Sequence, residues 1–143
     1  MLAKIPPAFL DLIEGPVSAA FTTVMPDGQP QTTVVWCNSD GEFILVNTMS
    51  RFQKARNMRR NPKVTLFAYD LSNTLRFIEV RGRVVEMTEE GALEHLDQLA
   101  ELYVGRSPYF GEVIPVEWKE KETPVLCKIE PVKVVAKDYS KEK

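Results

Sequence analysis

The chain has 143 residues, of which 44% are hydrophobic and 27% are charged, and its formal net charge is −2. This length and composition predict a single domain over residues 1–143 with a core of ordinary size. The charge argues against a nucleic-acid partner, and no apolar run reaches the roughly 20 residues needed to cross a membrane. Residues 1–7 show no secretory h-region, so we expect a cytoplasmic protein.

A short helix followed by a three-stranded meander is predicted for the first third of the chain. The helix covers residues 5–14 and ends at Gly15-Pro16. Strands are predicted over residues 17–25, 31–38 and 42–48. The turn between the first two strands places Gly28 where a positive φ is needed.

A basic helix is predicted after the third strand, ending at Asn61-Pro62. Residues 51–60 hold five cations. Thr48 and Ser50 are expected to cap the helix start, where free N–H groups and the helix dipole favour an anion. At helical spacing, three polar side chains share one face: Ser50, Lys54 and Asn57. These features indicate a phosphate site, while a solvated basic surface is the plainer interpretation of the same residues.

The rest of the chain is predicted to add three strands and one helix. The strands cover residues 63–69, 75–87 and 125–136, with a bulge at Gly82 and a break at Pro131. Thr88 is expected to cap a helix with an apolar face, and residues 105–123 form an irregular segment rich in aromatic residues. The fold class is therefore α+β, mainly β: six antiparallel strands closing into a barrel, with two or three short helices.

The residue types that usually carry chemistry are sparse. Cys37 and Cys127 lie far apart in strand-like runs and are expected to be buried, reduced thiols. His95 is the one histidine, which excludes a multi-histidine zinc site, so no metal is expected. His95 is predicted to lie on the surface of its helix. No catalytic side chain can be identified.

Three segments occur in an order that resembles a known family. They are residues 22–36 with the turn Asp27-Gly28-Gln29-Pro30, residues 43–68 with Lys54, Arg56-Asn57 and Asn61-Pro62, and the strand over residues 79–84. Together they resemble the FMN-binding split β-barrel superfamily, named after pyridoxamine 5′-phosphate oxidase. The chain looks most like its small branch that uses the deazaflavin coenzyme F420 or a flavin. The resemblance covers about residues 8–136.

This resemblance implies a homodimer with the cofactor lying across the barrel mouth at the dimer interface. It makes Lys54 the main cation for the cofactor phosphate. Three residues lie beside it in the family pattern, namely Thr48, Ser50 and Arg51, and Arg56 is placed to reach the same anion or the cofactor tail. Four residues of the second strand match positions that flank the ring system: Gln31, Thr32, Thr33 and Val34.

The expected function is an oxidoreductase that moves a hydride to or from a small organic substrate. Coenzyme F420 carries a phosphodiester and a glutamate tail, so the cations Arg56, Arg59 and Arg60 favour it over FMN. The aromatic segment 105–123 is expected to act as a lid. Vitamin B6 is not expected as the substrate, because the chain lacks the C-terminal Arg/His segment of true pyridoxamine phosphate oxidases. Two alternatives stay open: a non-catalytic flavin- or haem-binding barrel, and an OB-like nucleic-acid binder. An OB-like binder would carry basic residues interleaved with aromatic residues on one strand face, and the strands of this chain do not show that pattern clearly.

Overall fold

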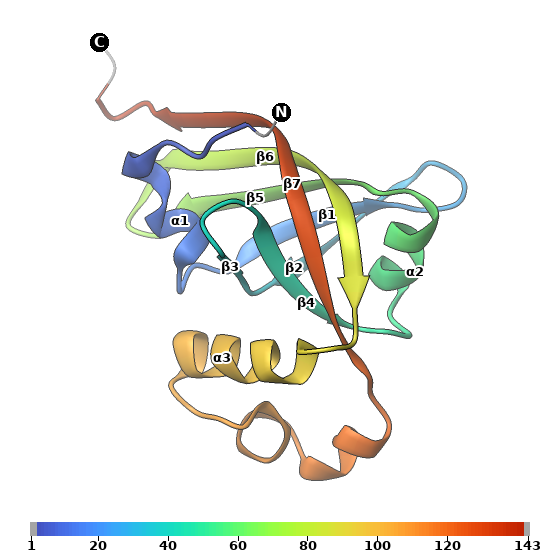
Figure 1. Cartoon of the computed structure of the whole chain (residues 1–143). Helices are drawn as coiled ribbons and strands as arrows, with labels where there is room; N and C mark the ends of the chain where they lie inside the picture. The colour runs from blue at the N-terminus through green and yellow to red at the C-terminus, as the bar shows by residue number, and fades with distance from the viewer. Residues whose placement is uncertain (1–2, 142–143) are drawn as a thin grey trace.

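Seven strands form one antiparallel sheet in the computed structural model, which describes residues 3–141. The strands are β1 Ala19–Val24, β2 Pro30–Val35, β3 Cys37–Ser39, β4 Ile44–Met49, β5 Lys63–Asp70, β6 Asn73–Thr88 and β7 Pro124–Asp138. Their order across the sheet is β2-β1-β5-β6-β7-β4-β3. The sheet curls around a core, with α3 and the segment that follows it beneath one side (Figure 1). The predicted mainly-β class and antiparallel arrangement are confirmed.

The prediction of six strands was wrong because the strand predicted over residues 31–38 divides at Trp36. β2 pairs with β1, ending at Val35 opposite Ala19, whereas β3 pairs with β4, starting at Cys37 opposite Val46. β2 and β3 are the two outer strands of the sheet. One continuous stretch of chain therefore joins the two edges of the curled sheet, and Trp36 lies at the junction.

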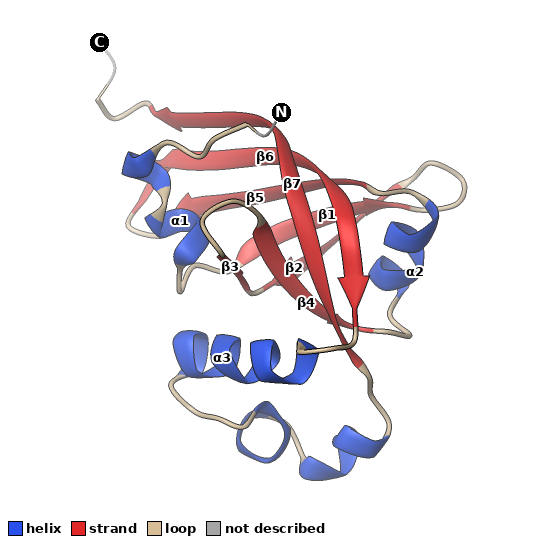
Figure 2. Cartoon of the chain, in the orientation of Figure 1, coloured by secondary structure: helices blue, strands red, loops and turns tan. Residues whose placement is uncertain are grey.

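Three α-helices and three short helical turns complete the fold (Figure 2). They are η1 Pro7–Phe9, α1 Asp11–Glu14, α2 Gln53–Arg60, α3 Ala92–Val104, η2 Tyr109–Val113 and η3 Val116–Glu120. The three α-helices were predicted, but the predicted capping residues of α2 and α3 are wrong. α2 begins after Phe52 with no side-chain cap, so Thr48 and Ser50 do not cap it. Thr88 ends β6, and α3 begins after Gly91. In both cases the chain needs a turn of several residues between strand and helix.

The bulge predicted at Gly82 is confirmed, and it explains why β7 continues past Pro131. The β6–β7 pairing shifts from Arg81 opposite Lys133 to Gly82 opposite Pro131. A Cβ atom at Gly82 would lie 2.6 Å from the Ile129 side chain and 3.0 Å from the Glu130 carbonyl oxygen. Only glycine fits this close approach. The predicted break at Pro131 is wrong, because the bulge accommodates the proline within the strand.

The core fills the inside of the curled sheet. Its largest wholly buried side chains include Phe21, Leu66 and Ile78 from the strands and Leu12 and Ile13 from α1. Cys37 and Cys127 are both buried and free, as predicted. Burial raises the pKa of the Cys37 thiol to about 11 and that of Cys127 to about 12, so both stay protonated at neutral pH. None of the helices within residues 3–141 is long and apolar enough to span a bilayer.

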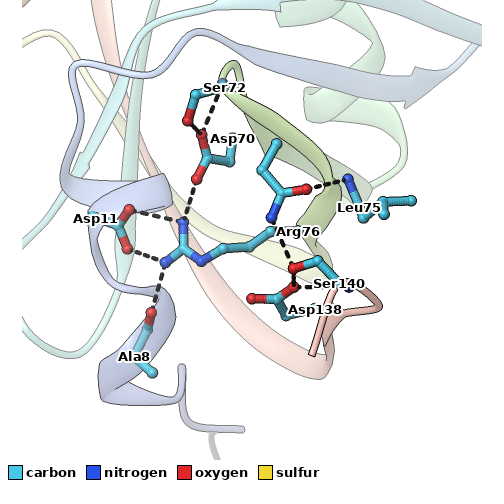
Figure 3. A network of polar contacts seen from close by, with 9 residues as sticks. Ala8, Asp11, Asp70, Ser72, Leu75, Arg76, Asp138 and Ser140 are labelled. Carbon is cyan, nitrogen blue, oxygen red and sulfur yellow. Dashed lines mark hydrogen bonds and ion pairs between the residues drawn. The ribbon is translucent and has the colours of Figure 1, made fainter. Parts of the chain in front are cut away.

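A polar network fixes α1 against the β5–β6 hairpin. The Arg76 guanidinium donates to both carboxylate oxygens of Asp11, at 2.6 and 3.0 Å, and to the Ala8 carbonyl oxygen at 2.7 Å (Figure 3). It also lies 3.4 Å from Asp70, whose carboxylate accepts from Ser72. The hydrogen bond from Arg76 lowers the pKa of Asp11. None of these residues belongs to the cavity described next.

Candidate functional site

A cavity of about 190 Å³ lies between the ends of β2 and β4, the start of α2, and α3 with the turn after it. Its lining residues are Val34, Val35, Trp36, Asn47, Thr48, Met49, Phe52, Lys54, Leu96, Leu99 and Tyr109. Most of these are apolar, with a few polar groups among them, which is typical of a small-molecule site. Two larger hollows, of about 540 and 510 Å³, contain no buried polar atom that lacks a partner among residues 3–141.

Lys54 is the cation of this cavity. It lies in the first turn of α2 and is half-buried, and no ion pair or hydrogen bond reaches its ammonium from residues 3–141. The nearest aromatic ring, that of Phe52, has its centroid 5.2 Å from Nζ. Desolvation lowers the pKa of Lys54. A half-buried ammonium without a counter-charge is unfavourable, and an anionic group in the cavity would remove that cost.

Two further polar atoms at the cavity are buried without a partner. They are the Thr48 hydroxyl and the side-chain oxygen of Asn47, both from β4. The buried hydroxyl of Thr33 in β2 is also unpaired among the described residues, but Thr33 does not line the cavity. Buried polar groups are nearly always hydrogen-bonded, so unpaired ones gathered at one cavity fit a polar ligand.

Asn47 belongs to a chain of three side chains. Its Nδ2 donates to the Ala92 carbonyl oxygen at 2.8 Å and lies 3.1 Å from His95 Nδ1. His95 Nε2 lies 2.8 Å from Asn38 Oδ1. His95 is only 5% exposed, so its predicted surface position was wrong. Desolvation lowers the pKa of His95 to about 4, and its imidazole is therefore neutral at neutral pH.

Sequence reasoning missed both Asn47 and His95. The residues around His95 in α3 are polar or charged, so a solvated face was the natural interpretation of that turn. The sequence feature that could have indicated a buried polar cluster lies in the strands. Asn38 and Asn47 both occupy strand positions, where asparagine is disfavoured, and a polar partner across the sheet face would account for them.

The arginines around Lys54 are bound to oxygen atoms of the protein itself. Arg51 forms an ion pair with the buried Glu122, with Nε 2.7 Å from its carboxylate, and Arg56 donates to the Arg51 carbonyl oxygen. Arg59 donates to the carbonyl and hydroxyl oxygens of Ser50, at 3.0 and 2.9 Å. Arg60 donates to the Val24 carbonyl oxygen. The bonds of Arg51, Arg56 and Arg59 hold the turn before α2 in place, and that of Arg60 joins the end of α2 to β1.

The predicted shared face of Ser50, Lys54 and Asn57 is wrong, because Ser50 precedes the helix and Asn57 faces the core. Asn57 is wholly buried; its Nδ2 donates to the Thr23 hydroxyl at 3.0 Å and its Oδ1 accepts from Gln53 at 2.8 Å. Asn57 therefore attaches α2 to β1. Lys54, one turn earlier, is left facing the cavity.

The second-strand residues that were expected to flank a ring system occupy different environments. Gln31 accepts a hydrogen bond from Thr23, and the Thr32 hydroxyl is paired with that of Thr22 at 2.8 Å. Val34 lines the cavity. The cavity thus brings together Val34, Thr48 and Lys54 from the predicted set. The other six predicted residues lie outside its lining: Gln31, Thr32, Thr33, Ser50, Arg51 and Arg56.

Aromatic side chains form one wall of the cavity. Trp36 stacks on Tyr103, with ring centroids 5.3 Å apart, and meets the edge of Tyr109 at 6.0 Å. Tyr109 comes from the segment that was predicted to be a lid, and its neighbour Phe110 is buried. Two other aromatic residues, Tyr69 and Trp118, are exposed and do not line the cavity.

Residues 5–137 match the family model described as pyridoxamine 5′-phosphate oxidase. An F420 reductase of solved structure is 28% identical, with a TM-score of 0.78 over 92% of this chain and 98% of that protein. A conserved hypothetical protein from Mycobacterium tuberculosis is 26% identical, with a TM-score of 0.74 over 96% and 87%. HupZ from Group A Streptococcus, 20% identical with a TM-score of 0.65 over 94% and 95%, shares the fold. No curated protein matches the chain.

Proposed function

Because this chain belongs to the pyridoxamine 5′-phosphate oxidase family, we propose that it is an oxidoreductase that binds coenzyme F420 or FMN and transfers a hydride to or from a small organic substrate. The observation that carries the proposal is the ammonium of Lys54. It lies at a largely apolar cavity, beside the Thr48 hydroxyl, and among residues 3–141 neither group has a counter-charge or a hydrogen-bond partner. A cationic amine with a neighbouring hydroxyl suits the phosphate that both cofactors carry.

A bound flavin or deazaflavin supplies the hydride chemistry itself. The chain's own residues bind the cofactor and exclude water. Lys54 and Thr48 hold the phosphate, and Trp36 and Tyr109 present apolar surface that excludes water from the cavity. The cofactor's own reactivity is consistent with a cavity lining that offers a cation and hydrogen-bonding groups but, within residues 3–141, no pair of nucleophile and base.

Within this proposal, coenzyme F420 is favoured over FMN. The F420 reductase neighbour supports the choice, because the similarity covers nearly the full length of both chains. The cations near Lys54 support it less strongly than the sequence alone indicated, since Arg56, Arg59 and Arg60 already donate to protein oxygens. All three are exposed, so they still contribute positive potential where an anionic tail would leave the cavity.

We also propose a homodimer in which a second copy completes the site. The outer face of β5 and β6 carries a chain of aromatic contacts: Tyr69 with Phe67 at 6.1 Å, Phe67 with Phe77 at 5.6 Å, and Phe77 with Tyr139 at 6.0 Å. Phe67, Tyr69 and Tyr139 are 36%, 40% and 49% exposed. An exposed apolar patch of this kind marks an interaction surface.

That patch is continuous with the cavity. Val34, a lining residue, lies in the same cross-strand row as Phe67, since both pair with Ala20 of β1. A cavity of about 190 Å³ is smaller than the roughly 300–1,000 Å³ of ordinary ligand pockets. A second copy covering the aromatic face would extend the walls of the cavity and enclose the remainder of the cofactor.

The competing proposal is a non-catalytic barrel that binds a flavin or haem. Titration of the purified protein with FMN, coenzyme F420 and haemin, followed by absorbance and fluorescence, separates the candidates. We expect saturable binding of F420 or FMN, and oxidation of the reduced cofactor when an unsaturated or quinone-like acceptor is added. Binding without oxidation by a panel of such acceptors would favour the non-catalytic role. A Soret band with haemin and no flavin or deazaflavin binding would overturn the proposal.

A further inference from the structure

We propose that Asn47 is a ligand-contacting residue whose side-chain oxygen accepts a hydrogen bond from a neutral N–H or O–H group of the bound cofactor, and that His95 is the positioning residue that holds the amide in this orientation. The inference rests on the proposed function, because it concerns recognition within the same cavity. It adds to that function a requirement on the ligand: a hydrogen-bond donor in addition to an anion.

The orientation of the Asn47 amide follows from one backbone group. The Ala92 carbonyl oxygen can only accept, and it lies 2.8 Å from Asn47 Nδ2. Rotating the amide by 180° would place its oxygen against that carbonyl oxygen and lose the bond. Nδ2 therefore faces Ala92 and His95, and Oδ1 is left as an acceptor without a partner among residues 3–141.

The same carbonyl determines the proton position on His95. Because Asn47 Nδ2 donates towards His95 Nδ1, Nδ1 must carry the lone pair and Nε2 the proton. Nε2 then donates to Asn38 Oδ1 at 2.8 Å. Every polar atom along this chain is consistent with a neutral imidazole, which the lowered pKa of His95 also indicates. The donor and the acceptor are thus determined for each hydrogen bond: Asn47 donates to Ala92 and to His95, and His95 donates to Asn38.

The unpaired Oδ1 points to a ligand because of its surroundings. Asn47 lines the cavity together with Thr48 and Lys54, so one wall offers an acceptor, a hydroxyl and a cation. A buried acceptor that stays unpaired is costly, and a ligand without a donor at this point would leave it so. The site therefore favours a ligand that combines an anion with a neutral donor. FMN and F420 have two donors of this kind, the imide N–H of the ring and the hydroxyls of the ribityl chain.

Two substitutions of His95 separate positioning from simple packing. His95→Asn places an amide oxygen near the former Nδ1, where it can accept from Asn47 Nδ2. His95→Gln places its amide near the former Nε2, which keeps the bond to Asn38 and leaves Asn47 Nδ2 without its second acceptor. We expect His95→Gln to weaken FMN and F420 binding about 3- to 10-fold and His95→Asn to bind within about twofold of wild type. Thermal melting of both variants verifies that each is folded.

The donor on the ligand is identified with modified probes. We expect Asn47→Leu to weaken FMN binding about 10-fold. The ratio of the Asn47→Leu dissociation constant to that of wild type should fall towards one for the probe that lacks the donor. That probe is 3-methyl-FMN if the imide N–H is the donor. It is FMN with a deoxygenated ribityl chain if a hydroxyl is the donor. A ratio that is equal for all three probes, or His95→Gln binding as tightly as His95→Asn, would overturn the inference. If Lys54→Ala weakens binding in these titrations and Asn47→Leu does not, only the inference fails; if neither cofactor binds wild type, both proposals fail.

Discussion

The hydroxyl of Tyr103 is bonded to both backbone groups of Cys37. It accepts from the Cys37 N–H at 3.0 Å and donates to the Cys37 carbonyl oxygen at 2.8 Å. Cys37 begins β3 directly after the junction at Trp36, whose ring stacks on the ring of Tyr103. One side chain of α3 therefore satisfies the backbone where the two edges of the sheet are joined, and the same contact positions a wall of the cavity.

Tyr103→Phe should reduce the free energy of unfolding by about 1–3 kcal/mol, because the N–H and carbonyl of Cys37 lose their shared partner in a part-buried place. Chemical denaturation followed by tryptophan fluorescence measures this directly. Tyr69→Phe is the matched control, since Tyr69 is exposed and its hydroxyl has no partner among the described residues. Equal stability of the two variants would show that the Tyr103 hydroxyl does not hold the junction.

Lys54→Ala should raise the dissociation constant for F420 or FMN about 10- to 150-fold, which corresponds to about 1.5–3 kcal/mol for a charge-assisted hydrogen bond. The melting temperature should not fall, because the variant removes a half-buried cation that has no partner in the described part of the chain. Isothermal titration measures the affinity, with Lys63→Ala as the control at an exposed position of β5. Unchanged affinity for both cofactors would remove Lys54 from the site.

Salt should weaken F420 binding more steeply than FMN binding. The tail of F420 carries anions beyond the phosphate, and these would meet exposed arginines, whose interactions are screened by added salt. Titrations of both cofactors between about 0.05 and 0.5 M salt give the two slopes. Parallel slopes, or tighter binding of FMN at every salt concentration, would favour FMN and leave the arginines to their role in holding the turn before α2.

Acid should destabilise the protein through His95. The pKa of His95 is lowered from 6.5 to about 4 by burial, so below pH 6.5 the unfolded chain takes up a proton that the folded chain does not. The free energy of unfolding therefore falls as the pH is lowered from 6.5 towards 4, by up to about 1.4 kcal/mol per pH unit and about 3 kcal/mol in all. His95→Asn lacks this proton, so its stability should change less between pH 6.5 and 5. Parallel pH profiles would contradict the assignment.

Light scattering at micromolar concentration should give twice the chain mass of 16.3 kDa. Phe67→Lys should shift the protein towards the monomer and weaken cofactor binding, since Phe67 lies in the aromatic face that the proposed dimer would cover. Val116→Lys changes an exposed apolar residue of η3 in the same way and should do neither. A monomer with full cofactor affinity would contradict both the dimer and the shared site.

The local features of the fold were predictable because they depend on neighbouring residues. Alternation and turn residues predicted the meander, and the strand–helix–strand order placed Lys54 at the start of α2. The division at Trp36 was not predictable, because the alternating pattern of residues 31–38 is the same whether one strand or two form. The burial of His95 depends on Asn38 and Asn47, which the fold alone brings to it. Features that require pairing partners far along the chain are not specified by local periodicity.

The position of β7 has a consequence for the order in which this protein folds. β7 is the last strand in the chain but lies between β6 and β4, where Ile44 pairs with Ile129. Before β7 is in place, the hairpin of β3 and β4 has no ladder to the strands β2, β1, β5 and β6. During synthesis the two parts therefore emerge without strand pairing between them other than the chain connection at Trp36, and the apolar inner face of β4 stays uncovered until residues 124–138 leave the ribosome. Such long-range closure is slow, so this interval is when the chain is most exposed to aggregation and to chaperones.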